Sequence, residues 1–379
     1  MAGANFTAGG ADHSAHLGKS GSDAKGIAAE DSCHYKFHMA RSVAIVGAGV
    51  SGLTCGVLFA ERGFTVNIFA EQVGTQTTSG AAAALWFPYD AEPADKVIPW
   101  ALATYKVLVD LCDNNPSVLA RELDGFKPSS LQTGVSMIEL RQYCRTGRIP
   151  VPEWANSLGG GVVTALPATP EQCEGGRAVG GHNFSDGFSL RVPLMDTTIY
   201  LDYLANRFQK AGGEIKAGVR FDKIDDVDPE SDLVINCAGI GARELARDAD
   251  LEPHRGQVAI VPKIENLKCA IVCDDDPLMY VIPRANDCLF GGTNEISNDL
   301  APEPKTTKTI VAECSRVLEV ESPRVIRERV GLRPFRKSGV RLEREKLSDG
   351  RTVIHNYGHG GSGFTLSWGC AGDVFELIG

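Results

Sequence analysis

The sequence predicts an α/β fold that opens with a Rossmann-type dinucleotide-binding unit. The apolar run Ser42–Val46 is typical of a buried parallel strand. The glycine-rich stretch Gly47-Ala48-Gly49-Val50-Ser51-Gly52 follows it directly. Glu71 stands 19 positions after the last of these glycines. A strand, a glycine turn and an acidic residue at this spacing indicate a βαβ unit that binds a dinucleotide.

Each glycine of this turn has its own physical reason. Gly47 permits the tight turn, Gly49 lets the backbone approach a pyrophosphate, and Gly52 permits close packing of helix on strand. A helix is expected over Leu53–Arg62, ended by Gly63. Its first N–H groups would face the phosphates. A purely structural turn is the alternative interpretation.

Glu71 ends a second predicted strand, Thr65–Ala70. Its carboxylate would accept hydrogen bonds from ribose hydroxyls and would disfavour the 2′-phosphate of NADPH. The fingerprint alone leaves NAD and FAD open. The short hydroxyl side chains of Thr77, Thr78 and Ser79 suit a second ligand contact and favour FAD.

The rest of the chain predicts a mixture of helices, strands and glycine-rich loops. Helices are expected at Trp100–Cys112, Thr197–Lys210 and Thr307–Glu319. Strands are expected as a pair within Glu214–Lys223, at Asp232–Cys237, Gln257–Pro262 and Met279–Ile282, and from Val353. Loops are expected at Leu158–Gly161 and Glu174–Gly187.

Composition limits the function classes. The 379 residues suggest two domains or one large one, and 42 of them are glycine, an excess that indicates tight turns and close ligand contacts. The net charge of −10 argues against nucleic acid and anionic membranes. No apolar run is long enough to span a membrane. The 11 cysteines form no C-x-x-C pair, which favours a reduced intracellular chain without a metal site. The C-terminus lacks a peroxisomal tripeptide, so a cytoplasmic location is expected.

From about Arg41 to Leu377 the chain resembles the D-amino acid oxidase family, FAD enzymes that include D-aspartate oxidase and glycine oxidase. Beyond the fingerprint, the resemblance is carried by several segments. They are Thr77–Tyr89, Val234–Gly239 with Arg255–Gln257, Tyr280–Pro283 with Gly291–Thr293, Val330–Pro334, Arg341–Glu345, and Val353–Thr365 with Trp368-Gly369.

The resemblance implies a Rossmann-type FAD-binding domain interleaved with a mixed-sheet α+β substrate domain. A disordered extension over 1–38 would precede them. The FAD-binding domain would comprise 39–90, 214–250 and 346–379. The substrate domain would comprise most of 91–213, with a return to the FAD domain, and 251–345.

The resemblance also assigns the substrate site. Arg333 would bind the substrate α-carboxylate, since a guanidinium pairs with a carboxylate through two parallel hydrogen bonds. The Tyr280 hydroxyl would touch the same carboxylate, and the Gly361 carbonyl would accept from the substrate amine. A surface ion pair for Arg333 and a core aromatic for Tyr280 are the alternatives. His359 is assigned to the flavin edge or to a supporting position rather than to a general base.

Pocket and cofactor contacts complete this assignment. Phe87, Asn294 and Arg284 would line the substrate pocket. Trp86 would lie near the flavin, with an ordinary core aromatic as an equal alternative for Trp86 and Phe87. Together the fingerprint and the resemblance imply FAD contacts at Gly47, Ala48, Gly49, Val50, Ser51, Gly52, Glu71, Thr77, Thr78, Ser79, Trp86, Phe221, Gly239, Gly360, Gly361, Ser362, Gly363, Phe364 and Thr365.

The implied reaction is oxidative deamination by hydride transfer to flavin N5, giving a 2-oxo acid, ammonia and hydrogen peroxide from an amino acid and oxygen. Neutral D-amino acids are favoured, because Asn294 and Cys273 stand where D-aspartate oxidases carry arginines, although Arg284 is a cation that could reach a distal carboxylate. Asp276 stands at the position of the mammalian lid tyrosine, which puts a lid in doubt. The alternatives are a glycine or secondary-amine oxidase, a D-aspartate oxidase, and an NAD-dependent dehydrogenase. Homo-oligomerisation is left open.

Overall fold

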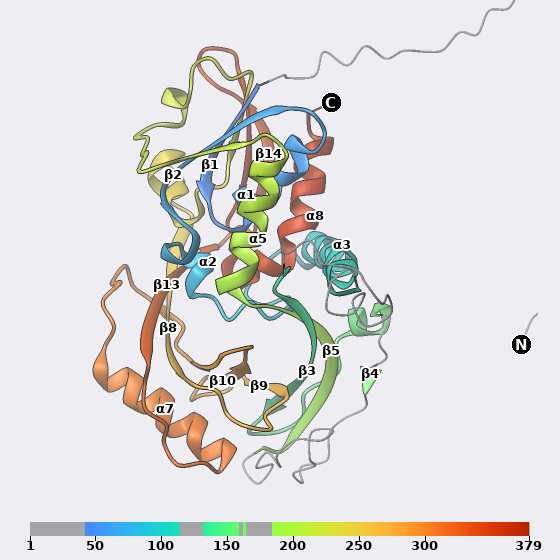
Figure 1. Ribbon diagram of the computed structural model, residues 1–379, viewed down its shortest axis with the longest axis vertical. Coiled ribbons are helices and arrows are strands. Elements are labelled where there is room, and N and C mark those ends of the chain that lie inside the picture. The colour runs from blue at the N-terminus through green and yellow to red at the C-terminus, as the bar shows by residue number, and fades with distance from the viewer. Residues whose placement is uncertain (1–41, 114–131, 159–161, 164–183, 379) are drawn as a thin grey trace, which may run out of the picture. The chain divides into compact units, whose positions relative to one another are not determined.

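A computed structural model describes residues 42–113, 132–158, 162–163 and 184–378 (Figure 1). All of them belong to one compact unit, Met39–Gly379. The expected extension over 1–38 lies outside the described residues, as do 159–161 and 174–183 of the expected loops. The backbone of this unit forms two sheets with helices packed on them, which agrees with the predicted fold class.

The first sheet has six strands in the order β14-β15-β7-β1-β2-β6. Five run parallel and β14 pairs antiparallel with β15. Strand β1 is buried through Val43, Ala44 and Ile45, as expected of a strand covered on both faces. The bounds are β1 Ser42–Ala48, β2 Thr65–Val73, β6 Glu214–Ala217, β7 Leu233–Asn236, β14 Arg341–Lys346 and β15 Thr352–Tyr357.

The second sheet has nine strands in the order β12-β8-β11-β10-β9-β3-β5-β4, with β13 also paired to β8. Its pairs are antiparallel except β3 with β9. The bounds are β3 Val135–Cys144, β4 Val162–Val163, β5 Asp186–Met195, β8 Leu251–Pro262, β9 Cys269–Cys273, β10 Met279–Pro283, β11 Asp287–Gly291, β12 Glu295–Ile296 and β13 Arg327–Arg336.

Each sheet has its own set of helices packed against it (Figure 1). The first sheet carries α1, α5 and α8, and α3 packs against α8. Helix α7 packs on the second sheet. The bounds are α1 Val50–Ala60, α2 Thr78–Ala81, α3 Ala94–Asp113, α5 Thr197–Lys210, α6 Ala242–Leu245, α7 Pro304–Leu318 and α8 Gly363–Glu376, and the short 3₁₀ turns are η1 Gly74–Gln76, η2 Glu153–Ser157, η4 Ile224–Asp226, η5 Gly239–Gly241 and η6 Gly360–Ser362.

Several expected elements change at their ends. Only the first half of the predicted strand pair in Glu214–Lys223 is a strand, because Gly218 takes a φ of +73° and turns the chain away from the sheet. The helix expected from Trp100 begins at Ala94 and runs through Pro99. Asp186 and Gly187, assigned to a loop, begin β5.

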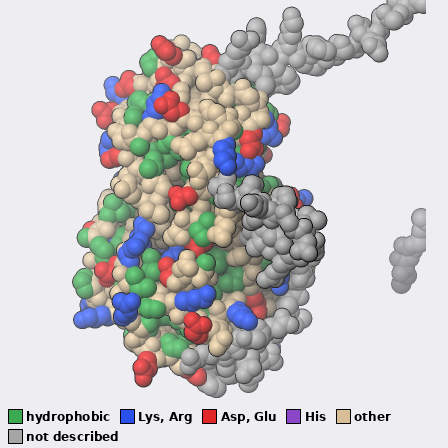
Figure 2. Space-filling model, viewed as in Figure 1, with side chains coloured by type: hydrophobic (Ala, Val, Ile, Leu, Met, Phe, Trp, Pro, Cys, Tyr) green, Lys and Arg blue, Asp and Glu red, His purple; other side chains and the backbone are tan. Residues whose placement is uncertain are grey.

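The boundary expected between Glu345 and Lys346 is also displaced. Strand β14, Arg341–Lys346, is the edge strand of the first sheet, so the chain has returned to that sheet before residue 345. Its alternating charged side chains suit an exposed edge. No helix within the described ranges is long and apolar enough to cross a membrane. On the face shown in Figure 2, basic and acidic side chains are interspersed.

Candidate active site

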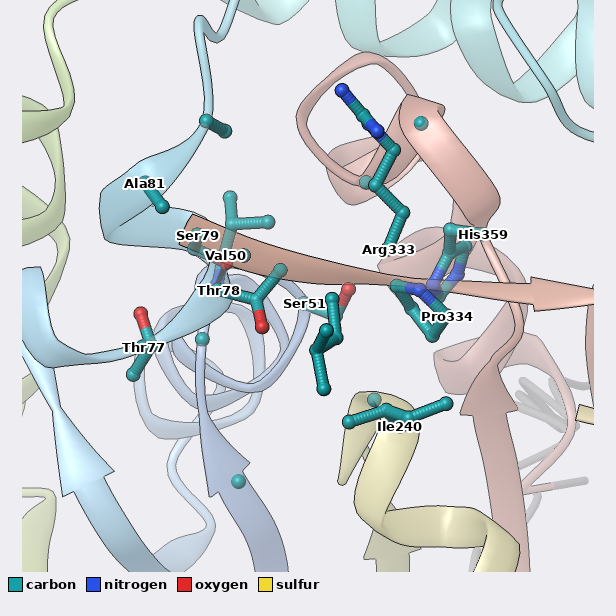
Figure 3. A pocket seen from close by; sticks show the side chains of 18 of the residues that line it. Val50, Ser51, Thr77, Thr78, Ser79, Ala81, Ile240, Arg333, Pro334 and His359 are labelled. Carbon is teal, nitrogen blue, oxygen red and sulfur yellow. Dashed lines mark hydrogen bonds between the residues drawn. The ribbon is translucent and has the colours of Figure 1, made fainter. Parts of the chain in front are cut away.

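A single cavity of about 1150 Å³ is bordered by both sheets. The glycine turn after β1 and the turn before α8 border it from the first sheet, and β13 and β10 border it from the second. Figure 3 shows Ser51, Thr78 and Ile240 at one part of this cavity and the Arg333 side chain extending away from them. The cavity is therefore long and has chemically different ends.

The glycine turn forms as the fingerprint predicts. Gly47 has a φ of +103°, and a Cβ there would lie 2.4 Å from the carbonyl oxygen of Cys237. A Cβ on Gly52 would lie 1.9 Å from the Gly47 oxygen, so neither position admits a side chain. Gly49 is the N-cap of α1 and has no side chain that could cap the first N–H groups of the helix. The Val50 N–H donates to Ser79 Oγ at 3.0 Å. This helix end lies open to the cavity and suits a phosphate.

Glu71 and Phe221 border the cavity beyond this turn. Glu71 is exposed and lies 3.5 Å from the Arg220 guanidinium, which also pairs with Glu244 at 2.8 Å. The Phe221 ring packs edge-on against Phe69, with centroids 5.5 Å apart. An acidic acceptor and an aromatic edge at this end suit the ribose and adenine of a dinucleotide.

The opposite end is built by the turn η6 before α8. Gly360 has a φ of +51°, and a Cβ on Gly361 would lie 2.5 Å from the Tyr89 ring. Ser362 Oγ accepts from the Tyr89 N–H at 2.7 Å and donates to its carbonyl at 2.6 Å. Thr365 Oγ1 does the same for Phe87, at 3.2 and 3.0 Å. Both hydroxyls therefore fix the segment Phe87–Tyr89 beside the glycine turn rather than line the cavity.

Arg333 and Tyr280 come together from neighbouring parts of the second sheet. Burial raises the pKa of Tyr280, while the nearby Arg333 charge and a hydrogen bond from its guanidinium lower it. Arg333 Nη1 donates to the Thr293 carbonyl at 2.9 Å and to Asn294 Oδ1 at 3.4 Å. No carboxylate among the described residues forms an ion pair with Arg333, although other arginines of β13 and β14 have such pairs. Its remaining N–H groups are free to receive an anion from the cavity.

Glycines create the space that these two side chains occupy. A Cβ on Gly256 would lie 2.6 Å from both terminal nitrogens of Arg333. A Cβ on Gly291 would lie 2.0 Å from the Tyr280 ring, and one on Gly292 would lie 2.5 Å from its hydroxyl. Strand register sets this arrangement, since Tyr280 lies opposite Gly291 and Gly256 lies opposite Gly331 in β13. The site is held by backbone close to both side chains.

His359 borders the cavity but is held neutral. Its side chain is 3% exposed, and its Nε2 lies 3.0 Å from Asn356 Oδ1. Burial lowers the pKa of His359 to about 4. A neutral, buried imidazole bonded to an amide is compatible with both positions expected from the sequence, at the flavin edge or supporting it.

Most of the predicted contacts border the cavity. Those that do are Gly47, Ala48, Gly49, Val50, Ser51, Glu71, Thr77, Thr78, Ser79, Phe87, Phe221, Gly239, Tyr280, Arg333, Gly360, Gly361, Gly363 and Phe364. Gly52, Trp86, Arg284, Asn294, Ser362 and Thr365 do not.

Three of these departures have clear reasons. Trp86 is fully buried and donates to the Ala101 carbonyl at 3.0 Å, so the core-aromatic alternative holds. Arg284 is 7% exposed and bonded twice to Asp287, at 2.7 and 2.9 Å, so it is tied away from the cavity. Asn294 is exposed and reaches the site through its contacts with the Arg333 guanidinium and the Tyr89 hydroxyl, each at 3.4 Å.

Several polar residues of the cavity were not predicted as site residues, among them Tyr89, Gln142 and Asp274. Tyr89 ends a segment that carried the family resemblance, and its hydroxyl accepts from Asn294 Nδ2 at 3.4 Å. Gln142 and Asp274 come from β3 and from the end of β9. Asp274 belongs to a run of three aspartates that looks like a solvated turn, and Gln142 had no local signal, because only the pairing of β3 with β9 brings them together.

Comparison with known proteins agrees with this geometry. The family model described as "DAO: FAD dependent oxidoreductase" matches residues 42–377. A D-amino-acid oxidase of Rubrobacter xylanophilus is 35% identical over 345 residues, covering 90% of this chain and 96% of that protein. One of Streptomyces coelicolor is 36% identical over 340 residues, covering 88% and 96%. Glycine oxidase from Geobacillus kaustophilus has a similar fold, with a TM-score of 0.72 at 18% identity over 89% of this chain and 94% of that one.

Proposed function

Because this chain belongs to the DAO family of FAD-dependent oxidoreductases, we propose that it oxidises D-amino acids to imino acids, which water converts to 2-oxo acids and ammonia. Membership of this FAD-dependent family argues against the alternative that the fingerprint left open, an NAD-dependent dehydrogenase. The observation that carries the proposal is the unpaired Arg333 guanidinium beside the Tyr280 hydroxyl in the cavity.

The cavity residues fit FAD. The side-chain-free turn Gly47–Gly49 and the open end of α1 would hold its pyrophosphate, and Glu71 its ribose. The backbone of Gly360–Gly361 would face its ring system. When bound, FAD would accept the two electrons that leave with the substrate's α-hydrogen as its C–N single bond becomes the C=N bond of the imine, and oxygen would take them on to form hydrogen peroxide.

The protein's own contribution is orientation and charge. Arg333 binds the α-carboxylate through two parallel hydrogen bonds, and the neutral Tyr280 hydroxyl donates a further one. This clamp fixes the α-carbon relative to the glycine turn of η6, where the Gly361 carbonyl accepts from the substrate amine. The buried, neutral His359 takes no proton at physiological pH, so no side-chain base is assigned.

The same site argues against substrates that carry an acidic side chain. D-aspartate would need a second cation, and Arg284, which the sequence offered for this, is bound to Asp287. Neutral D-amino acids therefore remain the expected small substrates. The glycine or secondary-amine oxidase alternative shares the carboxylate clamp and differs only in the groups around the α-carbon.

The test is a peroxide assay of the FAD-loaded protein with D-alanine, L-alanine, glycine, sarcosine and D-aspartate. We expect kcat/KM to be highest for D-alanine by at least roughly tenfold, a difference of about 1.4 kcal/mol. Faster turnover of glycine or sarcosine would select the alternative, and turnover of L-alanine alone would refute the proposal.

A further inference from the structure

The cavity carries a carboxylate that the proposed reaction does not use. Asp274 follows directly after β9 and borders the same cavity as Arg333 and Tyr280. Its side chain keeps solvent-accessible surface although the surrounding protein partly desolvates the carboxylate. Within the ranges that the structure describes, no lysine or arginine forms an ion pair with it. A negative group in the substrate cavity thus lacks a positive partner.

The position of Asp274 follows from strand register. Gln142 of β3 and Tyr280 of β10 both lie opposite Val272 of β9, so these three residues cross the sheet side by side. Asp274 lies two residues beyond Val272, on the same face of the sheet. From strand spacing and rise, its Cα lies roughly 8 Å from that of Tyr280. A long side chain on a substrate held by Tyr280 and Arg333 can span this separation.

Gln142 fixes the direction of this carboxylate. Its Nε2 donates to Asp274 Oδ2 at 2.9 Å. Its Oε1 is buried without a hydrogen-bond partner, so the bond to Asp274 is what orients the amide. Gln142 is therefore a positioning residue, and the second carboxylate oxygen of Asp274 remains available.

The charges of Asp274 and Arg333 both influence Tyr89, a third residue that borders the cavity. Burial raises the pKa of Tyr89, the Asp274 charge raises it further, and the Arg333 charge lowers it, so both charges are near enough to act on this phenol. Burial also raises the pKa of Asp274, its hydrogen bond from Gln142 lowers it, and the neighbouring Asp275 charge raises it again. The attraction of a cation in the cavity would offset this desolvation penalty and favour the charged carboxylate.

We propose that Asp274, oriented by Gln142, is the specificity residue that binds the cationic side chain of a long D-amino acid such as D-arginine or D-lysine. Arg333 binds the α-carboxylate and Asp274 binds the guanidinium or ammonium group at the other end of the substrate. This inference rests on the proposed D-amino acid oxidation and extends the expectation of neutral substrates toward cationic ones.

The test compares D-arginine with D-citrulline, which has the same length and a neutral urea in place of the guanidinium. In the wild-type holoenzyme, kcat/KM for D-arginine should exceed that for D-citrulline by roughly tenfold to a hundredfold, the range for one charged hydrogen bond. In Asp274→Asn the ratio should fall to within about threefold of one. The ratio is the readout, because it cancels any general loss of activity in the variant.

Asp276→Asn is the matched control. It removes the same charge two residues away, and Asp276 is exposed and does not border the cavity. We expect it to keep the wild-type ratio, whereas an equal fall in both variants would mean that only the overall charge matters and would overturn the assignment. D-alanine turnover with no preference for D-arginine would overturn the inference and leave the proposed function standing. No turnover of any D-amino acid would refute the proposed function itself.

Discussion

Replacing Arg333 by alanine tests the carboxylate clamp directly. The substitution removes the guanidinium and leaves Tyr280 and the Thr293 carbonyl at the place proposed for the substrate carboxylate. Truncating one partner of a buried charge pair costs about 2–5 kcal/mol. The corresponding loss in kcat/KM for D-alanine is roughly 30- to 5000-fold. Arg333→Lys should lose less, because it keeps the charge and gives up the two parallel hydrogen bonds.

The assay measures peroxide with D-alanine and with D-alaninamide, which lacks the carboxylate. The variant should lose activity with D-alanine much more than with D-alaninamide, since the amide has no charge for Arg333 to pair. Flavin absorbance per protein checks that FAD still binds, which we expect because the Arg333 side chain extends away from Ser51 and Thr78 (Figure 3). A loss below about tenfold with D-alanine, or equal losses with both substrates, would refute the clamp.

Three further changes test other parts of the structure. Gly52→Ala should yield protein with little bound flavin and a lowered Tm, since its Cβ would lie 1.9 Å from the Gly47 oxygen, whereas Gly372→Ala in α8 meets nothing within 4 Å and should bind flavin normally; equal flavin content would contradict the close packing. Tyr280→Phe should lower kcat/KM for D-alanine by roughly tenfold to a hundredfold, from loss of one hydrogen bond to a charged group; an unchanged value would return Tyr280 to the role of a core aromatic. Burial depresses the pKa of His359 from 6.5 to about 4, so the unfolded chain binds the extra proton between these values and stability falls as pH drops through this window, by on the order of 3 kcal/mol for this group. His359→Gln should show a correspondingly flatter pH dependence in urea unfolding at pH 7, 5 and 4, and parallel curves would contradict this.

Local patterns predicted the parts of the site that lie on continuous segments. Gly47–Ser51 of the fingerprint, the nearby Glu71, and the turn at Gly360–Gly361 that the resemblance implied each lie on a short continuous segment and border the cavity. The helix Thr197–Lys210 was predicted with the bounds that it has, since its apolar spacing and the Gly212-Gly213 stop are local signals.

Features that depend on pairing between distant strands escaped prediction. One local pair was missed as well: Arg284 was expected in the pocket, but Asp287, three residues later, binds its guanidinium. Asp274 and Gln142 are 132 positions apart and meet through the parallel pairing of β3 with β9. Without the strand order, neither residue could be assigned to the site.

Glycines contribute both to the features that lie on continuous segments and to those that depend on strand pairing. Gly47 and Gly52 were expected to permit the tight turn and the close packing of helix on strand, and a Cβ on Gly52 would collide with the Gly47 oxygen. Gly256, Gly291 and Gly292 serve a different purpose, because a Cβ at any of them would overlap the Arg333 or Tyr280 side chain. A glycine opposite a functional side chain in a neighbouring strand thus carries the same information as a glycine in a cofactor loop. This role of a glycine can be recognised only when the strand register is known. The Gly-Gly-Thr segment at 291–293 therefore supported the resemblance, but the sequence did not show that its glycines make room for Tyr280.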